Sequence, residues 1–269
     1  MNPSKVCDLS LMSWNILAPC WVEKEWYPSV YDLAADYETR IKTIASNISS
    51  RNCNVIMIQE AQEDMIPFFQ EELGNDYLAE FAPNNPTPSP IGNGLLTLIH
   101  KDWKYAKEAK IINGILDRER GDAIQIVYIP SKNIHLVNLH LDYICPLPQA
   151  KIVKNKCNEL LGTSRSMSIM AGDMNADKYV YEQFEWFEFK NVFNESNTDI
   201  IIPSYYTDRH DEETNISIDH IFYDPKQVTL IKYGKAWNVQ DRSLEDALRT
   251  FGSDHIYVWA DFNFIQNKK

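Results

Sequence analysis

The sequence predicts a layered α/β sandwich in which two β-sheets are stacked and covered by helices. Two patterns support this fold class: short strand-like runs recur along most of the chain, and a few amphipathic helical patterns lie between them. The length supports it as well, because 269 residues with 44% hydrophobic side chains can bury one large core.

Three helices are expected. In residues 36–52, Ile41, Ile44 and Ile48 recur at intervals of three and four, and Asp36 precedes them as an N-cap. The second and third helices are expected over residues 63–73 and 147–163.

The strand-like runs are short and largely apolar, which is typical of buried strands. We expect strands over residues 10–14, 55–59, 95–100, 110–115, 123–129, 134–141, 167–171, 218–223, 228–232 and 256–264. Residues 252–258 form a further strand-like run with polar groups at its start.

The chain shows no linker and no internal repeat, so residues 1–269 are expected to form a single domain. Its only proline-rich stretch, residues 82–90, is short enough to be one surface loop. No apolar run approaches the roughly 18 residues that a spanning helix needs, and no signal-peptide pattern is present. We therefore expect a soluble, cytoplasmic monomer without a membrane span, and the sequence points to no adaptor protein.

Charge and cysteine content narrow the function classes. Five cysteines without a Cys-x-x-Cys spacing argue against a disulfide framework and a thiolate zinc site and favour reduced thiols. The net charge of −12, from 38 acidic and 26 basic residues, argues against broad binding to duplex nucleic acid. Two lysine clusters, within residues 101–110 and 151–156, are interpreted as solvated faces and not as a basic groove.

The Gly-Asp-Met-Asn run at residues 172–175 follows a buried apolar run. An extended segment points alternate side chains to the same side, so Asp173 and Asn175 would meet at one spot. A carboxylate and a carboxamide there would suit a water and a phosphate oxygen beside a hard cation. On this fragment alone, ordinary turn chemistry explains the pair equally well.

Five other strand-like runs also carry polar groups at one end. Each group taken singly has a structural explanation, such as a turn residue, a helix-cap neighbour, a core histidine or a surface charge. Their combination favours a single functional site. The groups are, in chain order, Asn15, Glu60, His140, Asp219 with His220, and Ser253 with Asp254 and His255.

Six short motifs occur in order along nearly the whole chain: SWNILA at residues 13–18, IQE at 58–60, NLHL at 138–141, GDMN at 172–175, IDHIF at 218–222 and GSDH at 252–255. With these motifs the sequence resembles the endonuclease/exonuclease/phosphatase, or DNase I-like, superfamily. It looks most like the branch of poly(A) deadenylases, nocturnin-like enzymes and 2′-phosphodiesterases. The resemblance implies a four-layer α/β sandwich, two central mixed β-sheets flanked by helices, with the site at one edge of the sheets.

The resemblance also implies a metal site. Glu60 is expected to anchor Mg²⁺, with Mn²⁺ as a substitute, because one or two carboxylates and several waters usually hold this ion. Asn15 would support the ion or a phosphate oxygen from the neighbouring strand. Asp254 would hold a second metal or tune the first.

Catalytic roles follow from the same resemblance. Asp173 and Asn175 would orient and polarise the attacking water. His255 looks like the family histidine that contacts the scissile phosphate as a base or charge stabiliser, with Asp219 hydrogen-bonded to it and fixing its tautomer. The alternative is a purely structural Asp–His pair.

Two further histidines are treated differently. His140 resembles a histidine near the leaving group, where it would donate a proton, and its alternative is a core hydrogen bond on a strand. His220 replaces the aromatic residue that usually follows the aspartate, and we assign it no role.

Aromatic residues bear on the substrate. Deadenylases of this branch resemble one another in an aromatic residue shortly before the aspartate, where it stacks on adenine, but residues 214–218 contain none. Stacking is worth roughly 1–3 kcal/mol per base, so this absence argues against strict poly(A) recognition. Tyr205 and Tyr206 would either substitute from the preceding loop or serve in loop packing. A second aromatic cluster is expected in the core: Trp186, Phe187 and Phe189.

We therefore expect a Mg²⁺-dependent phosphodiester hydrolase, either a 3′–5′ exoribonuclease or deadenylase-like enzyme on single-stranded RNA, or a nucleotide phosphodiesterase. The alternatives are a phosphatase or phospholipase-like hydrolase on lipid or inositol head groups, and an endonuclease on DNA. A lipid substrate would call for an apolar or basic patch, and the sequence shows no clear one. A non-catalytic binding relative is disfavoured because none of the candidate carboxylates is missing.

Overall fold

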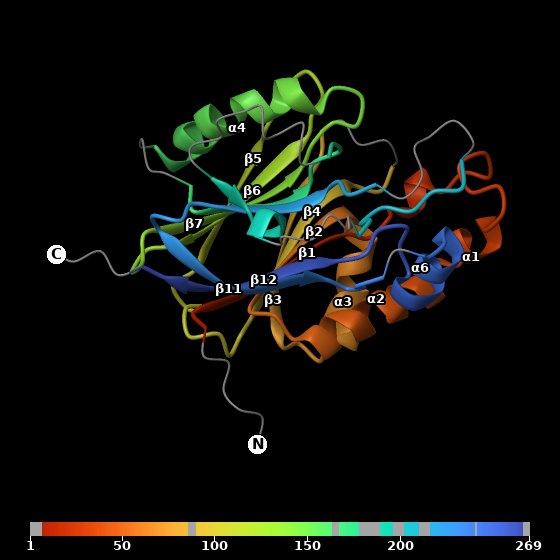
Figure 1. Ribbon diagram of the computed structural model, residues 1–269, viewed down its shortest axis with the longest axis horizontal. Coiled ribbons are helices and arrows are strands. Elements are labelled where there is room, and N and C mark those ends of the chain that lie inside the picture. Colours follow the sequence, from red (N-terminus) through yellow and green to blue (C-terminus); the bar gives the residue numbers. More distant parts are fainter. Residues whose placement is uncertain are drawn as a thin grey trace.

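Two six-stranded β-sheets pack against each other in the computed structural model, and helices cover the outer face of each sheet (Figure 1). The structure describes residues 7–85, 90–162, 167–177, 189–195, 202–209, 216–239 and 241–265.

The first sheet combines strands from both ends of the sequence. In spatial order they are β11 (Val228–Lys235), β12 (Val258–Phe264), β1 (Leu9–Asn15), β2 (Val55–Gln62), β4 (Asn93–His100) and β3 (Tyr77–Pro83). β1 and β2 run parallel, whereas all other neighbours are antiparallel.

The second sheet comes from the middle of the sequence. In spatial order its strands are β5 (Lys110–Ile115), β6 (Ala123–Ile129), β7 (Ile134–His140), β8 (Ile169–Asp173), β10 (Asp219–Tyr223) and β9 (Lys190–Asn191). Again one pair, β7 with β8, is parallel. Each sheet therefore has one place where two neighbouring strands end together at their carboxyl ends.

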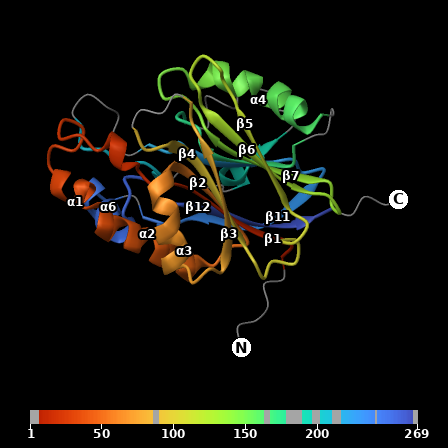
Figure 2. The ribbon, with the colours of Figure 1, turned by 180° about the vertical axis from the view of Figure 1, so that it is seen from behind.

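Helices complete a four-layer arrangement, which confirms the expected fold class (Figures 1 and 2). In the part of the chain that the structure describes, α4 (Pro146–Leu161) lies on the second sheet. Among the described residues no helix is long and apolar enough to cross a membrane. The helices on the first sheet are α1 (Tyr31–Ala35), α2 (Tyr37–Arg51), α3 (Ile66–Glu72) and α6 (Leu244–Phe251).

β2 shows how one strand builds two interfaces. Val55 and Met57 pack into the core between the sheets, whereas Ile56 and Ile58 pack under the helices. This alternation arises because successive side chains of a strand point to opposite sides. Since both faces are buried, β2 has the continuous apolar run that the sequence shows.

The three expected helices are confirmed with small shifts at their ends. α2 begins after Asp36, whose carboxylate accepts the Thr39 N–H at 3.2 Å. Residues 63–73 divide into a 3₁₀ turn, Glu63–Met65, followed by α3. The pattern of apolar residues did not indicate β3, α1 or α6. Of the proline-rich stretch expected as a loop, residues 82–83 belong to β3 and residues 86–89 lie outside the described residues.

The expected strand over residues 252–258 is wrong. Gly252 ends α6 with a left-handed φ of +74°, and a Cβ there would lie 2.6 Å from the carbonyl oxygen of Arg40. The chain then turns, and β12 begins only at Val258. Asp254 and His255 therefore reach the molecule's edge from a loop at the amino end of a strand.

Arg40 on α2 is almost fully buried, with 3% of its surface exposed, and among the described residues its guanidinium donates to backbone carbonyl groups. Its Nε donates to Gly252 O at 2.7 Å, and its Nη1 donates to Ala34 O at 3.1 Å. Its Nη2 donates to Ile16 O at 2.8 Å and also to Leu17 O. One side chain thus joins the loop after β1, the end of α1 and the end of α6.

We expect Arg40→Met to lower the free energy of unfolding by about 3–5 kcal/mol, because it leaves several buried carbonyl groups unpaired. Urea unfolding measures this change. Arg249→Met is the matched control: Arg249 is exposed and pairs with Glu245 one turn away on α6, so its loss should cost less than about 1 kcal/mol. Similar losses for the two variants would contradict the role of Arg40.

His220, which received no role from the sequence, is a structural residue of the second sheet. It is fully buried on β10, with Nδ1 3.0 Å from Asn191 Nδ2 and Nε2 3.0 Å from Ala176 O. A neutral ring satisfies both neighbours, with Nε2–H donating to the carbonyl and Nδ1 accepting from the amide. Burial accordingly lowers the pKa of His220 to about 4, from an ordinary value of 6.5.

This shift predicts loss of stability in acid. As pH falls from 6.5 to about 4, the unfolded chain binds a proton at His220 and the folded protein does not. The free energy of unfolding therefore decreases as the pH decreases over that range. His220→Phe keeps a ring beside Phe222, and we expect this variant to be less stable than the wild type at pH 7. Because the variant lacks the titrating group, its unfolding free energy should change less with pH, by about 1.4 kcal/mol per pH unit. Urea unfolding between pH 4 and pH 7 tests this, and parallel curves for the two proteins would refute it.

Candidate active site

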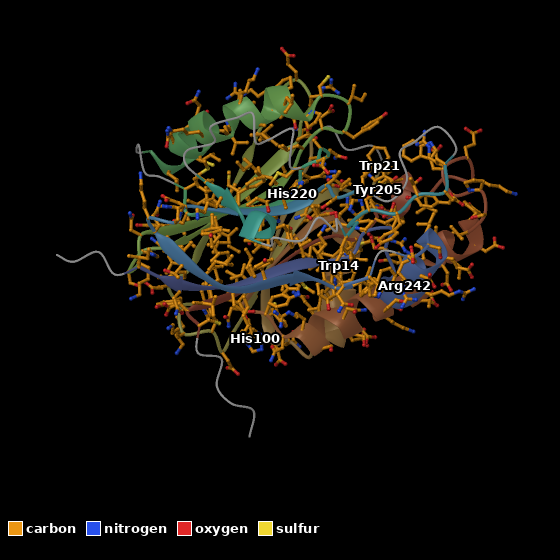
Figure 3. All side chains as sticks on the ribbon, viewed as in Figure 1. Trp14, Trp21, His100, Tyr205, His220 and Arg242 are labelled. Atoms are coloured by element: carbon orange, nitrogen blue, oxygen red, sulfur yellow. The ribbon has the colours of Figure 1, made fainter. Side chains whose placement is uncertain are left out.

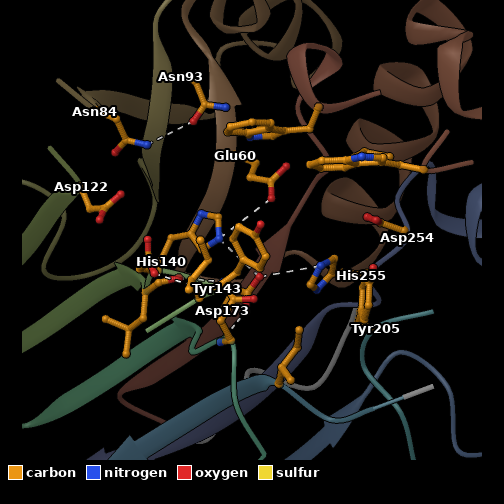
Figure 4. Close-up of a pocket in the computed structure, with 18 of the residues that line it drawn as sticks. Glu60, Asn84, Asn93, Asp122, His140, Tyr143, Asp173, Tyr205, Asp254 and His255 are labelled. Atoms are coloured by element: carbon orange, nitrogen blue, oxygen red, sulfur yellow. Dashed lines mark hydrogen bonds and ion pairs between the residues drawn. The ribbon is translucent and has the colours of Figure 1, made fainter. Parts of the chain in front are cut away.

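Asp173, the last residue of β8, lies at the centre of a cluster of polar side chains (Figure 4). Its Oδ2 accepts a hydrogen bond from Asn15 Nδ2 at 3.0 Å. The same oxygen lies 3.6 Å from Nε2 of His140 and 3.7 Å from Nε2 of His255. Polar groups from the carboxyl ends of β1, β7 and β8 and from the loop before β12 therefore meet around one carboxylate oxygen.

The backbone around Asp173 explains its position. Gly172 is required because a Cβ there would lie 1.8 Å from the carbonyl oxygen of Leu139 on β7. Asn175 has a left-handed φ of +48°, and its N–H donates to Asp173 Oδ1 at 2.9 Å. Its Nδ2 donates to Leu141 O at 2.7 Å. The two side chains thus belong to a turn and not to an extended segment, and the turn holds Asp173 in place.

An irregularity in β2 sets the direction of the Glu60 side chain. The pairing of β2 with β4 shifts register between Ile58 and Ala61, and Glu60 takes a left-handed φ of +59°. Such bulges turn a side chain away from the regular alternation, and a left-handed glutamate is strained by roughly 1–3 kcal/mol. The carboxylate is held by Ala18 N–H at 2.9 Å and Asn15 Nδ2 at 2.8 Å.

Asn15 connects two carboxylates. Its Nδ2 donates to both Glu60 Oε1 and Asp173 Oδ2, while its Oδ1 accepts the Leu17 N–H at 3.0 Å. The amide therefore offsets the repulsion between two anionic groups. Both Nδ2 hydrogens and Oδ1 are thus engaged within the protein, so Asn15 positions the two carboxylates and has no N–H left for a ligand.

Asp219 and His255 form the hydrogen-bonded pair that the family resemblance implies, with 2.8 Å between Asp219 Oδ2 and His255 Nδ1. Both side chains are buried. Burial alone would lower the pKa of His255, but the negative charges of Asp219, Asp173 and Asp254 outweigh it and raise the pKa to about 10. The pair leaves Nε2 of His255 directed toward Asp173.

Asp254 contacts a residue that the motifs did not indicate. Its Oδ2 accepts a hydrogen bond from the Tyr27 hydroxyl at 2.8 Å, and both side chains are buried. Burial raises the pKa of Asp254, and the nearby charge of Glu60 adds to this effect. Tyr27 therefore fixes Asp254 from a loop more than two hundred residues away, a pairing that no local pattern reveals.

Hydrogen bonds also join the two ends of the sequence behind the site. Trp14 Nε1 donates to the His255 carbonyl at 3.0 Å, and Ser253 Oγ donates to the Asn15 carbonyl at 2.8 Å. The motif that opens the site and the motif that closes it are thus held as one unit.

His140, at the end of β7, turns toward the site and not into the core. Its Nε2 lies 3.6 Å from Asp173 and 4.0 Å from Glu60 Oε1, and 22% of its side chain is exposed. This position leaves the ring accessible to a ligand.

A pocket of about 660 Å³ opens over these residues. Asp254, His255 and Tyr205 lie on one side of it, Asn84, Asn93 and Asp122 lie on the other, and Glu60, His140 and Asp173 lie between them (Figure 4). The volume is in the usual range for small-molecule sites. All eight candidate residues except Asn15 and Asp219 line it directly, and those two support its floor through hydrogen bonds.

The two candidate tyrosines have different positions. Tyr205 lines the pocket, with its ring centroid 4.9 Å from that of His255. Tyr206 is fully buried and packs on Trp237, so it belongs to the core. Trp21, labelled with Tyr205 in Figure 3, lines the same pocket. Of the second aromatic cluster, Phe189 packs under α4, as expected, and residues 186–187 lie outside the described residues.

The donor set fits a divalent cation that prefers oxygen. Glu60, Asp173 and Asp254 bring three carboxylates to one pocket, and Asp219 Oδ1 is buried without a hydrogen-bond partner among the described residues. Ligand atoms of Asp173, Asp219 and His255 also lie within 4.8 Å of one another. Mg²⁺ retains several waters, so the partly exposed Glu60 is better suited to it than this fully buried group.

Solved structures share this fold. ANGEL2, described as a 2′,3′-cyclic phosphatase, aligns over 94% of each chain with a TM-score of 0.72 and 16% identity. The human Nocturnin catalytic domain aligns over 96% of this chain and 93% of its own, with a TM-score of 0.63 and 17% identity. A mannosyl-6-phosphatase from Bacteroides thetaiotaomicron aligns over 95% and 100%, with a TM-score of 0.64 and 17% identity.

The sequence itself identifies the family. No curated protein matches the chain. The profile of the Endonuclease/Exonuclease/phosphatase family, however, matches residues 12–255, a range that includes every candidate site residue. Members of this family hydrolyse phosphoesters. The protein therefore belongs to the endonuclease/exonuclease/phosphatase family.

Proposed function

We propose that the protein is a Mg²⁺-dependent phosphodiester hydrolase whose substrate is a nucleotide or the end of a single-stranded RNA. One observation carries this proposal: Asp173 Oδ2 lies between Asn15 Nδ2, His140 Nε2 and His255 Nε2 on the floor of the pocket. Two imidazole nitrogens beside a carboxylate that Asn15 holds in place provide both partners for phosphoester hydrolysis, donors for the phosphate and an acceptor for water.

Charge neutralisation is the main requirement, because negative charge grows on the phosphate oxygens during attack. Glu60 and Asp254 would hold the cation, which supplies positive charge next to the phosphate when it is bound. His255 adds positive charge from the protein, since Asp219 keeps its proton in place. The amide of Asn15 would hold the carboxylates of Glu60 and Asp173 in position.

The remaining residues would move protons. Asp173 would accept a hydrogen bond from the attacking water and so orient it, with the turn at Asn175 fixing the carboxylate. His140 is more exposed and would donate a proton to the leaving oxygen. The 3.6 Å between Asp173 Oδ2 and His140 Nε2 supports an acceptor and a donor that would act on the same phosphate group.

Features of the pocket support a nucleotide or RNA end over a larger surface. The cavity is about 660 Å³, which suits one nucleotide and its neighbour better than a duplex. The acidic balance of the chain also disfavours binding to duplex DNA. Among the structural neighbours, ANGEL2 is a 2′,3′-cyclic phosphatase, and this activity deserves a direct test here.

We expect Mg²⁺-dependent release of product from single-stranded RNA with an oligo(A) tail, from RNA ending in a 2′,3′-cyclic phosphate, or from a nucleoside 2′,3′-cyclic phosphate. Glu60→Gln should lower kcat/KM by about 100-fold or more, about 2.7 kcal/mol, because it removes the anionic ligand while keeping the shape. Product formation followed by chromatography, with and without a chelator, measures both effects.

The control is Glu72→Gln on the exposed face of α3, which should retain full activity. The panel also includes a duplex DNA with an abasic site, mannose 6-phosphate and an inositol phosphate. Hydrolysis confined to these three would exclude the proposed substrate class. Full activity in Glu60→Gln would exclude the proposed role of Glu60.

Asp219→Asn tests the histidine pair. The asparagine keeps the size of the side chain but removes the charge that holds the proton of His255, so kcat should fall by about 100-fold or more while KM changes little. Asp224→Asn is a matched control, since Asp224 is a buried aspartate that follows β10 at its other end. It should leave kcat unchanged. Equal effects of the two substitutions on kcat would indicate a structural Asp–His pair.

A further inference from the structure

Two tryptophans line the pocket without a part in the chemistry described above. Trp21 and Trp26 lie in the loop between β1 and α1, and both are partly exposed. Their rings stack with 6.3 Å between centroids and only 5° between planes. They therefore present nearly parallel flat faces at the pocket wall.

The loop that carries them is fixed at both ends to carboxylates of the site. Ala18 N–H donates to Glu60 Oε2 at 2.9 Å, and the Tyr27 hydroxyl donates to Asp254 Oδ2 at 2.8 Å. Between these points, Cys20 N–H donates to Gln62 Oε1 at 2.9 Å. The indole pair is thus held at a set position relative to the groups that would act on phosphate.

Another apolar group of the pocket comes from the second sheet. Tyr143 is 70% exposed and Ile144 is 61% exposed, in the loop after β7, and both line the pocket. Asp142 Oδ1 accepts the Ile144 N–H at 3.0 Å, and Arg120 binds Asp142 Oδ2 at 2.7 Å, so the loop is ordered. Large apolar side chains that are exposed to solvent beside a pocket are typical of a ligand-binding surface.

We propose that the Trp21–Trp26 pair binds the nucleobase of the substrate by stacking, which makes the pair the part of the site that selects nucleotides. This inference rests on the proposed function, because the base would belong to the nucleotide whose phosphate lies at Asp173. Flat π faces suit an aromatic heterocycle better than a puckered sugar or inositol ring. The guanidinium of Arg209, with Cζ 5.5 Å from the Trp26 ring centroid, adds positive charge that favours an anionic nucleotide.

The test compares adenosine 5′-monophosphate with ribose 5-phosphate, which share the sugar and phosphate and differ only in the base. Isothermal titration calorimetry with Mg²⁺ should show about tenfold tighter binding of the nucleotide. Trp21→Leu and Trp26→Leu should each remove most of that difference and leave ribose 5-phosphate binding unchanged. The matched control is Trp259→Leu. Trp259 lies on β12 outside the pocket, and its ring packs against the guanidinium of Arg51 from α2.

Circular dichroism verifies that each variant is folded, and Trp21→Phe, which keeps an aromatic face, should retain part of the preference. The proposal is overturned if the wild-type protein binds the two ligands equally or binds no nucleotide, or if both leucine variants bind the nucleotide as the wild type does. Base-dependent binding in a protein that hydrolyses none of the tested substrates would remove the proposed function and leave the stacking site standing. Hydrolysis that does not depend on the base would support the proposed function and remove the stacking site.

Discussion

The buried guanidinium of Arg40 is the constraint on which the fold and the site both depend. Burial lowers the pKa of its guanidinium, while the negative charge of Asp254 and Glu60 favours the charged form. Its five N–H groups can satisfy several carbonyl groups that a loop-rich edge would otherwise leave unpaired. The acidic site therefore stabilises the arginine, and the arginine orders the loops that shape the acidic site.

Much of the fold follows from local patterns. β2 was predictable from its continuous apolar run, and α2 was predictable because its isoleucines recur at three and four and Asp36 is a suitable cap. β3 was not, since it lies at a sheet edge and exposes half of its side chains. The loop at residues 252–257 looked like a strand because its turn depends on Gly252 and its contact with Arg40, which are far apart in sequence.

The site was predictable to a different degree. The sequence identified the polar residues at strand ends, and the parallel pairs in each sheet bring them together. It could not indicate that Asp173 would be their common partner, or that Tyr27 would hold Asp254, because these contacts join separate elements. It also could not distinguish Tyr205 from Tyr206. In the structure, Tyr205 lines the pocket and its neighbour Tyr206 is buried in the core.

The hydrogen bonds that join the two ends of the sequence have a consequence for the newly made protein. Trp14 and His255 are 241 residues apart, and the loop before β12 contacts both β1 and β10. While a ribosome is still making the chain, the segment with Asp254 and His255 does not yet exist, although Asn15, Glu60 and Asp173 do. The pocket therefore receives its last two polar groups only after residue 255 has been translated, so an unfinished chain lacks the complete candidate site.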